Sequence, residues 1–565
     1  MKYTTPLLSG ALALGILAAA TPSPAQSSYD LLLRGGRVVD GTGAPWFAAD
    51  VAVRDGRIAA IGRLENASAK RLVDATGLVI APGFIDLLGQ SEYNVLVDGR
   101  AASKITQGIT TEVTGEGASI APVNDRMLAE GRDAYARYGY TPEFRTLDGY
   151  FKTFERRGAS INLGSLVGSG GVRHFVIGQD NRRATPEELR QMCALVGEAM
   201  REGALGLSSS LQYVPDIFNS TEELVAMAKV AARYGGAYFT HQRSESGHID
   251  ASLDEVFRIA SEAGIRSQVW HLKTAYRPNF GRMPEILTKI EAARARGIDV
   301  SANQYPWNRA SNGLDACLPP WAREGGREAL LKRLADPKAR ARVKTDMAQD
   351  SADWENRWLG AGGGDGVMVA EVLSPKLKAY EGRTIAAIAA AEKKDPRDVV
   401  IDIVLAGRAS VACILSIMDE QDVRAALSHP LVSFDTDSQA KAQDGPFAGE
   451  TSHPRGWGSA ARILGYYVRE QKLLRLEEAV RKMTSLAAQA AGIPDRGLVK
   501  VGFRADLTLF DPTTVAARAT FENPNQYSAG IPYVAVNGVL VVDGGRITDA
   551  RPGQALRGPG YPGSR

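Results

Sequence analysis

The fold of this protein is decided by three apolar runs that each end in polar side chains: GGAYFTHQRSESGHID (235–250), IRSQVWHLKTAYRPN (265–279) and GIDVSANQYPWNRAS (297–311). Helical patterns over 254–262 and 283–296 lie between the runs. Strands that alternate with helices at this spacing predict a parallel sheet built from βα units. In a closed (β/α)8 barrel the residues that end each strand face the active-site mouth. His241 and His271 are therefore predicted to lie on neighbouring strand ends, facing one cavity.

These two histidines are the first candidate functional residues. A single histidine at a strand end is more often a hydrogen-bonded structural residue than a ligand. Two of them on successive strand ends, in a chain with only six histidines, favour a metal site, because imidazole is a common zinc ligand.

The first 25 residues have the pattern of a secretory signal peptide. Lys2 supplies a positive charge, 7–20 is apolar, and small residues precede a cleavage site after Ala25. We expect an exported protein, periplasmic or secreted, with no membrane span in the mature chain. The alternative is an uncleaved N-terminal anchor, for which the apolar run is short.

Charge and cysteine content give no sign of nucleic acid or of a disulfide framework. Without Lys2, 66 basic residues face 64 acidic ones, a net charge of +2, so we expect no nucleic-acid partner. Cys193, Cys317 and Cys413 are widely spaced and form no Cys-x-x-Cys motif. One bridge is compatible with the sequence, but the fold does not depend on a set of them.

Short-strand patterns lie at both ends of this 565-residue chain, which is long enough for a large barrel and a small accessory domain. Residues 29–82 carry alternating runs with a hairpin turn signal at Asp55-Gly56, and 497–550 repeat this style. We predict an α/β protein in which both chain ends form one small β-sandwich. A TIM-like (β/α)8 barrel is predicted over 83–490.

The strand period disappears at about 319–368, where charged helical sequence leads into a glycine-rich run. An insertion of this length on the mouth side of a barrel is often a lid or a binding loop. A solvated pair of surface helices is the alternative.

Several motifs, in the right order over about residues 29–545, resemble the D-aminoacylase (N-acyl-D-amino-acid deacylase) family of the amidohydrolase superfamily. They are GRVVDGTG (36–43), APGFID (81–86), QGITT (107–111), YFTH (238–241), WHLK (270–273), YP (305–306), VSFDTD (432–437) and HPRGWG (453–458). The resemblance implies a β-sandwich, a metal-bearing barrel and hydrolysis of an amide bond.

The chain departs from this family at the first barrel strand. The family usually has His-x-His after the Gly-Phe-Ile-Asp run, where it holds one metal of a possible pair. Here residues 87–90 read Leu-Leu-Gly-Gln, which offers no good zinc ligand. The first metal position is therefore predicted to be empty, and a two-metal mechanism is disfavoured.

The second metal position is retained. Glu116 falls where the family has a metal-binding cysteine, and His241 and His271 match its two histidines. A carboxylate is an acceptable zinc ligand, although Glu116 between two glycines is also compatible with a plain turn. The resemblance thus implies one divalent metal ion, with zinc as the first choice.

The resemblance also implies a proton carrier and a carboxylate clamp. Asp437 matches the family's proton carrier, but Asp435 projects from the same face of a strand and is a rival. Asp437 would act as general base on metal-activated water and then protonate the leaving amine. The positions that match the family's recognition of a substrate α-carboxylate are Lys273, Arg455, Tyr213, Tyr305 and Ser311.

We therefore expect a metal-dependent amidohydrolase that cleaves the amide bond of N-acyl-D-amino acids or related D-configured peptides. Its partner would be a small acyl amino acid or a short peptide. Another amide or ester substrate on the same scaffold is one alternative, because a fold does not determine a substrate. An inactive periplasmic binding protein for acyl amino acids is the other. The sequence predicts neither the acyl group nor the oligomeric state.

Overall fold

The computed structural model describes residues 1–2, 28–351 and 354–563. The predicted signal peptide lies, apart from its first two residues, outside this part of the chain. Among the described residues, no helix combines the length and the apolar character that a membrane crossing requires. Cys193, Cys317 and Cys413 are free thiols.

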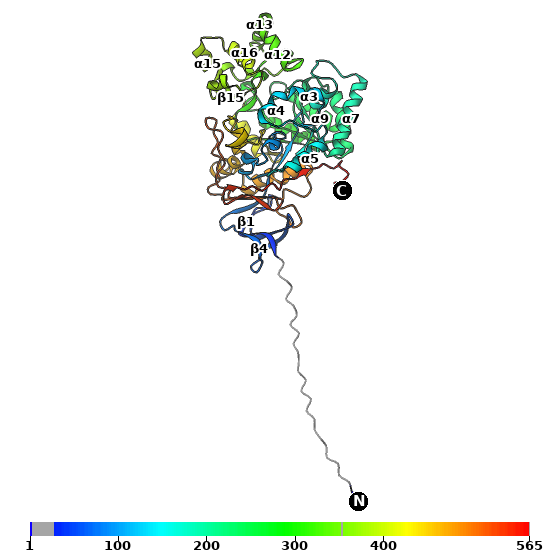
Figure 1. Ribbon diagram of the computed structural model, residues 1–565, viewed down its shortest axis with the longest axis vertical. Coiled ribbons are helices and arrows are strands. Elements are labelled where there is room, and N and C mark those ends of the chain that lie inside the picture. The colour runs from blue at the N-terminus through cyan, green and yellow to red at the C-terminus, as the bar shows by residue number, and fades with distance from the viewer. Residues whose placement is uncertain (3–27, 352–353, 564–565) are drawn as a thin grey trace.

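Both chain ends contribute strands to one sheet, as predicted for the β-sandwich domain (Figure 1). The N-terminal strands are β1 (Tyr29–Val38), β2 (Phe47–Arg54), β3 (Arg57–Gly62), β4 (Ala69–Asp74) and β5 (Val79–Pro82). The C-terminal strands are β18 (Leu507–Phe510), β19 (Tyr533–Val536), β20 (Val539–Asp543) and β21 (Arg546–Ile547). The two groups join where β5 pairs antiparallel with β18. Asp55 and Gly56 have positive φ angles of 51° and 71° and form the predicted hairpin turn between β2 and β3.

Between these ends the chain forms a ring of parallel strands, which confirms the predicted TIM-like barrel. Its strands are β6 (Phe84–Asp86), β7 (Ile109–Thr114), β8 (Asn162–Ser165), β9 (Val167–Gly168), β10 (Gly206–Ser210), β11 (Ala237–His241), β12 (Arg266–Val269), β13 (Val300–Gln304) and β17 (Val432–Phe434). One run of pairing joins β6, β7 and β8, and the other joins β9 through β13 and then β17. A parallel bridge between Gly89 and Ser438, just beyond the ends of β6 and β17, closes the ring.

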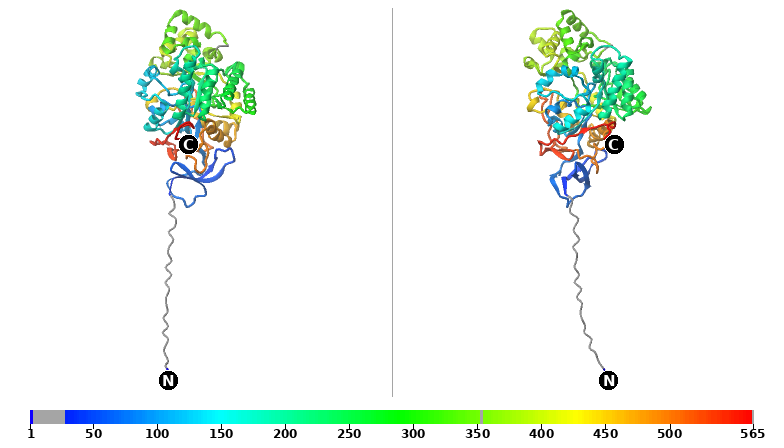
Figure 2. Two further views of the ribbon diagram at one scale, coloured as in Figure 1. Left: turned by 90° about the vertical axis from the view of Figure 1, so that its right-hand side faces the viewer. Right: turned by 45° about the vertical axis from the view of Figure 1, so that its right-hand side comes forward.

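Helices cover the outside of the barrel (Figure 2). The helices of the barrel segments are α1 (Asn94–Val97), α2 (Ala102–Ile105), α3 (Asp125–Glu130), α4 (Arg132–Tyr138), α5 (Leu147–Arg157), α6 (Ser169–Val176), α7 (Pro186–Glu202), α8 (Thr221–Arg233), α9 (Ile249–Ala263), α10 (Met283–Ala295), α17 (Glu420–Ser428), α18 (Arg455–Arg462), α19 (Leu476–Met483) and α20 (Ser485–Ala491). Thr185 and Ser220 start α7 and α8 with capping boxes, which satisfy backbone N–H groups at the helix ends. The apolar face of α9, with Leu253, Val256 and Phe257, packs in a buried cluster against the barrel.

The predicted insertion at about 319–368 lies within a segment outside the barrel that has its own small sheet. This segment begins with β14 (Ala310–Gly313) and ends with β16 (Val411–Leu415), and β15 (Val367–Val372) completes their antiparallel sheet. Its helices are α11 (Pro320–Arg323), α12 (Gly326–Ala335), α13 (Pro337–Met347), α14 (Arg357–Gly360), α15 (Ile385–Glu392) and α16 (Pro396–Ala406). β14 follows barrel strand β13 closely, and its partner β16 lies far along the chain. Figure 1 shows this subdomain at the end of the molecule opposite the β-sandwich.

Candidate metal site and active-site cavity

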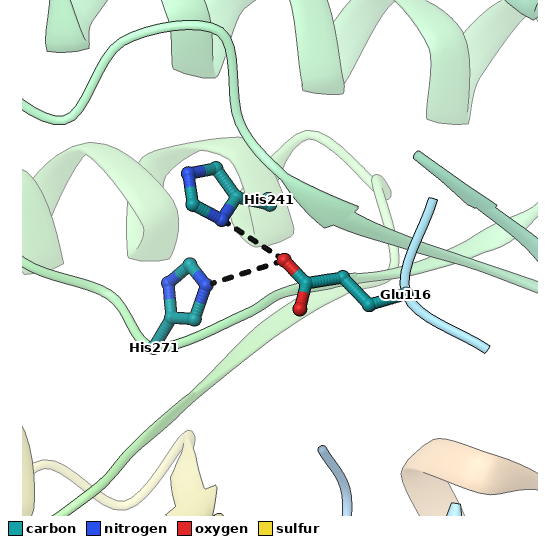
Figure 3. A group of neighbouring side chains, drawn as sticks. All are labelled: Glu116, His241 and His271. Atoms are coloured by element: carbon teal, nitrogen blue, oxygen red, sulfur yellow. Dashed lines mark hydrogen bonds and ion pairs between the residues drawn. The ribbon is translucent and has the colours of Figure 1, made fainter. Parts of the chain in front are cut away.

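Three side chains from different barrel strands meet at the carboxyl-end face of the barrel (Figure 3). Glu116 follows β7, His241 ends β11 and His271 follows β12. Glu116 Oε1 lies 3.0 Å from His241 Nδ1 and 3.9 Å from His271 Nε2, and the two imidazole centroids are 4.4 Å apart. One ligand atom from each residue lies within 4.8 Å of the others. The structure therefore brings together the three metal ligands predicted from the sequence.

This donor set fits a divalent metal ion. One carboxylate and two imidazoles are typical of catalytic zinc sites, which leave a further position for water. Burial would raise the pKa of Glu116, but the hydrogen bonds and charges of His241 and His271 outweigh it and hold the pKa below its usual value. Burial also lowers the pKa of His241 to about 4. Both groups are thus held in the deprotonated forms that bind metal.

Glu245 and Lys273 contact each other next to the two histidines. Lys273 was predicted as a clamp residue, whereas Glu245 was not predicted. Lys273 Nζ donates to Glu245 Oε1 at 2.6 Å and lies 2.8 Å from His271 Nδ1. Burial lowers the pKa of His271, as does Lys273, but Glu245 and Glu116 raise it to about 9. Metal binding at His271 therefore has to displace a proton. Sequence reasoning missed Glu245, which no motif marked.

Gln90 lies between two carboxylates at the predicted empty metal position. Its side-chain Nε2 donates to Glu116 Oε2 and to Asp437 Oδ1, both at 2.8 Å. Leu88, from the same tetrapeptide, is fully buried in an apolar cluster. The Gln90 amide thus bridges the two carboxylates, at the position where the family has a metal-binding histidine. Sequence analysis recognised Gln90 as a poor zinc ligand but not this role.

Asp437 and its rival Asp435 have different surroundings. Asp437 lines the cavity, and its Oδ2 lies 2.7 Å from Arg455 Nη1. Asp435 is fully buried, and neither of its carboxylate oxygens has a hydrogen-bond partner among the described residues. Burial raises the pKa of Asp435 well above its usual value. The geometry therefore favours Asp437 as the group that reaches a substrate.

A buried lysine forms hydrogen bonds with the residues on both sides of Asp437. Lys104 Nζ donates to Thr436 Oγ1 at 2.6 Å and to Ser438 O at 2.7 Å. The same ammonium lies 2.8 Å from Asp86 Oδ2 and 2.5 Å from a Glu112 oxygen. Asp437 itself has a φ of 45°, which is uncommon for a residue other than glycine. This network, which sequence reasoning missed, holds the loop in that conformation.

The predicted clamp residues line one cavity of about 570 Å³ together with Glu116, His241, His271 and Asp437. They are Lys273, Arg455, Tyr213, Tyr305 and Ser311. The Arg455 guanidinium lies 4.8 Å from the ring centroid of Tyr305, and the Tyr213 ring packs edge-on against His241 at 5.0 Å. The two cations are not free, because Lys273 is paired with Glu245 and Arg455 with Asp437. The buried Nε of Arg455 nevertheless has no hydrogen-bond partner among the described residues.

Comparison with known proteins gives matches over nearly the whole chain. The profile described as "Amidohydrolase family" matches residues 71–542. D-aminoacylase of Alcaligenes xylosoxydans xylosoxydans is 36% identical over 529 residues, which cover 94% of this chain and 97% of that protein. These matches confirm the resemblance inferred from the motifs.

Two solved structures are also similar. One is N-acyl-D-glutamate deacylase from Bordetella bronchiseptica, complexed with zinc and a phosphonate inhibitor that mimics the tetrahedral intermediate. It has a TM-score of 0.78 at 32% identity and covers 94% of this chain and 100% of its own. The other, a D-aminoacylase described with a binuclear metal center, one-metal activation and second-metal attenuation, has a TM-score of 0.76 at 33% identity, with the same coverage.

Proposed function

This chain belongs to the amidohydrolase family and is a metal-dependent hydrolase of carbon–nitrogen bonds other than peptide bonds; from that premise we propose that it deacylates N-acyl-D-amino acids with one zinc ion. The observation that carries the proposal is the meeting of Glu116, His241 and His271 in one cavity with Asp437. The substrate class is supported by the relatives, a D-aminoacylase and an N-acyl-D-glutamate deacylase.

Each group has a defined part in this reaction. Glu116, His241 and His271 would hold the ion, which supplies a water of lowered pKa and a Lewis acid for the scissile carbonyl. Asp437 accepts a proton from the attacking water and returns it to the leaving amine nitrogen. Burial raises the pKa of Asp437, which suits a group that holds a proton between two steps. Gln90 and Arg455 keep its two oxygens in place.

The single-ion count is supported by the first barrel strand. Leu88 offers no ligand, and the Gln90 amide already satisfies one oxygen of Glu116 and one of Asp437. A second ion between these carboxylates would have to displace that amide. The related D-aminoacylase described with one-metal activation is consistent with chemistry at one ion.

Orientation of the substrate is assigned to the clamp residues. We place the α-carboxylate against Arg455 and Lys273, with the hydroxyls of Tyr213, Tyr305 and Ser311 around the cavity. The unpartnered Nε of Arg455 supplies a donor for it, and a guanidinium binds a carboxylate through directed hydrogen bonds. We also propose that the protein is exported, on the pattern of residues 1–25.

The test is amine release from paired N-acetyl-D- and N-acetyl-L-amino acids, with and without added zinc and a chelator. We expect D-selective release that the chelator abolishes and zinc restores, with about one ion per chain by metal analysis. Turnover of the L-series alone would refute the substrate class. Binding without turnover of any substrate would favour the binding-protein alternative.

A further inference from the structure

The active-site cavity contains a buried cation that the proposed mechanism does not use. Arg357 begins α14 in the inserted subdomain and is 4% exposed. It lines the cavity that holds Glu116, His241 and His271, and it also borders a neighbouring cavity.

Unlike Lys273 and Arg455, Arg357 has no carboxylate of the described residues within ion-pair distance, although Glu355 and Glu245 favour its charge at longer range. Lys273 lies 2.6 Å from Glu245, and Arg455 lies 2.7 Å from Asp437. No ion pair joins Arg357 to any residue in the part of the chain that the structure describes. Because no described carboxylate contacts this cavity-lining guanidinium directly, an anionic group that enters the cavity can form an ion pair with it.

The guanidinium is held in place by neutral groups. Its Nη2 donates to Gln212 Oε1 at 2.5 Å, and Gln212 Nε2 donates to the Gln242 carbonyl oxygen at 3.0 Å. Its central carbon lies 5.2 Å from the Tyr213 ring centroid. An arginine has five N–H donors, and within the described residues the hydrogen bond to Gln212 is the one that this guanidinium forms. The remaining donors are available for a carboxylate, which can bind through two parallel hydrogen bonds.

Arg357 and Arg455 occupy different places in the cavity. Arg357 stacks on Tyr213, whose ring in turn contacts His241 edge-on at 5.0 Å. Arg455 stacks on Tyr305 at 4.8 Å. One aromatic ring therefore separates the Arg357 guanidinium from a metal ligand. A substrate whose α-carboxylate binds at Arg455 still leaves a positive group open to its side chain.

We propose that Arg357 forms a second anion subsite and that the enzyme prefers N-acyl-D-amino acids with a carboxylate side chain. This inference rests on the proposed function. The second carboxylate of an N-acyl-D-aspartate or N-acyl-D-glutamate supplies the direct ion-pair partner that Arg357 lacks among the described residues. The neutral amides, N-acyl-D-asparagine and N-acyl-D-glutamine, have nearly the same shape without the charge.

The experiment compares kcat/KM for N-acetyl-D-glutamate and N-acetyl-D-glutamine in the zinc-loaded enzyme. A charge-assisted hydrogen bond corresponds to a factor of about 10 to 100, so wild type should prefer glutamate by at least about tenfold. Arg357→Gln should remove that preference mainly by lowering kcat/KM for glutamate. Arg357→Lys, which keeps the charge, should retain part of it. Arg323→Gln is the control, since Arg323 lies in the same subdomain but borders only the neighbouring cavity.

Equal kcat/KM for the two substrates in wild type would overturn the inference. An equal loss on both substrates in Arg357→Gln would also overturn it, because Arg357 would then bind a group common to both. If neither substrate turns over, the proposed function fails separately. Calorimetry then measures binding of the same two compounds to wild type and to Arg357→Gln. The subsite is supported if wild type binds the glutamate compound more tightly and the substitution abolishes this difference.

Discussion

Replacing Gln90 with Leu tests whether the bridging amide positions Asp437. The substitution removes two 2.8 Å hydrogen bonds to carboxylates, one to Glu116 and one to Asp437. A hydrogen bond to a charged group contributes about 1.5–3 kcal/mol. If the bond to Asp437 holds this carboxylate in its reactive orientation, kcat should fall about 10- to 100-fold, since every 1.4 kcal/mol in the barrier is a factor of ten.

Two other quantities should change little in this variant. Metal content should stay at about one ion per chain, because Gln90 is not one of the three candidate ligands Glu116, His241 and His271. KM should be nearly constant, because Gln90 forms no hydrogen bond to the proposed clamp residues. The assay is steady-state amine release from an N-acetyl-D-amino acid, together with metal analysis of the purified protein.

Gln439→Leu is the matched control, since Gln439 lines the same cavity. This variant should keep the wild-type kcat. An unchanged kcat in Gln90→Leu would refute the positioning role. Loss of the bound ion in that variant would show that Gln90 acts through Glu116 and the metal site rather than through Asp437.

Three further predictions follow from the same region. Asp437→Asn should abolish turnover while zinc binding remains, whereas Asp435→Asn should retain most of kcat; the reverse result in the same assay would make Asp435 the proton carrier. Lys104→Met should lower the free energy of unfolding by about 3–5 kcal/mol, because Asp86 and Glu112 then lack their cation. This is the usual effect of breaking a buried ion pair. An unchanged free energy of unfolding in denaturant would contradict this prediction. Burial, with the charges of Glu112 and Glu116, raises the pKa of Glu92 to about 7 from 4.5. The folded state therefore holds a proton that the unfolded state loses between those values, and stability falls as pH rises through this range. Glu92→Gln should remove this loss of stability, which is worth at most about 3 kcal/mol. The same pH dependence of the melting temperature in wild type and variant would contradict this prediction.

The order of strands and helices was predictable from the sequence because its signals are local. Each apolar run from 235 to 311 became a barrel strand, and His241 and His271 follow from their places at strand ends. The shared sheet of the two chain ends was predictable from its alternating pattern and from the Asp55-Gly56 turn. Glu116 was identified only through the family motif. Its neighbouring glycines are equally compatible with an ordinary turn, so the local sequence alone did not mark it.

The sequence by itself thus determined the barrel, the β-sandwich and the candidate metal ligands, whereas tertiary structure alone decided how the site is held. Gln90 reaches Asp437 across 347 positions of the chain, and Lys104 reaches Ser438 across 334. Arg357 lines the cavity only because the inserted subdomain brings α14 to it. The physical reason is range: strand and helix patterns depend on neighbouring residues, but the orientation of a carboxylate and the pairing of a charge depend on residues that only the closed barrel brings together.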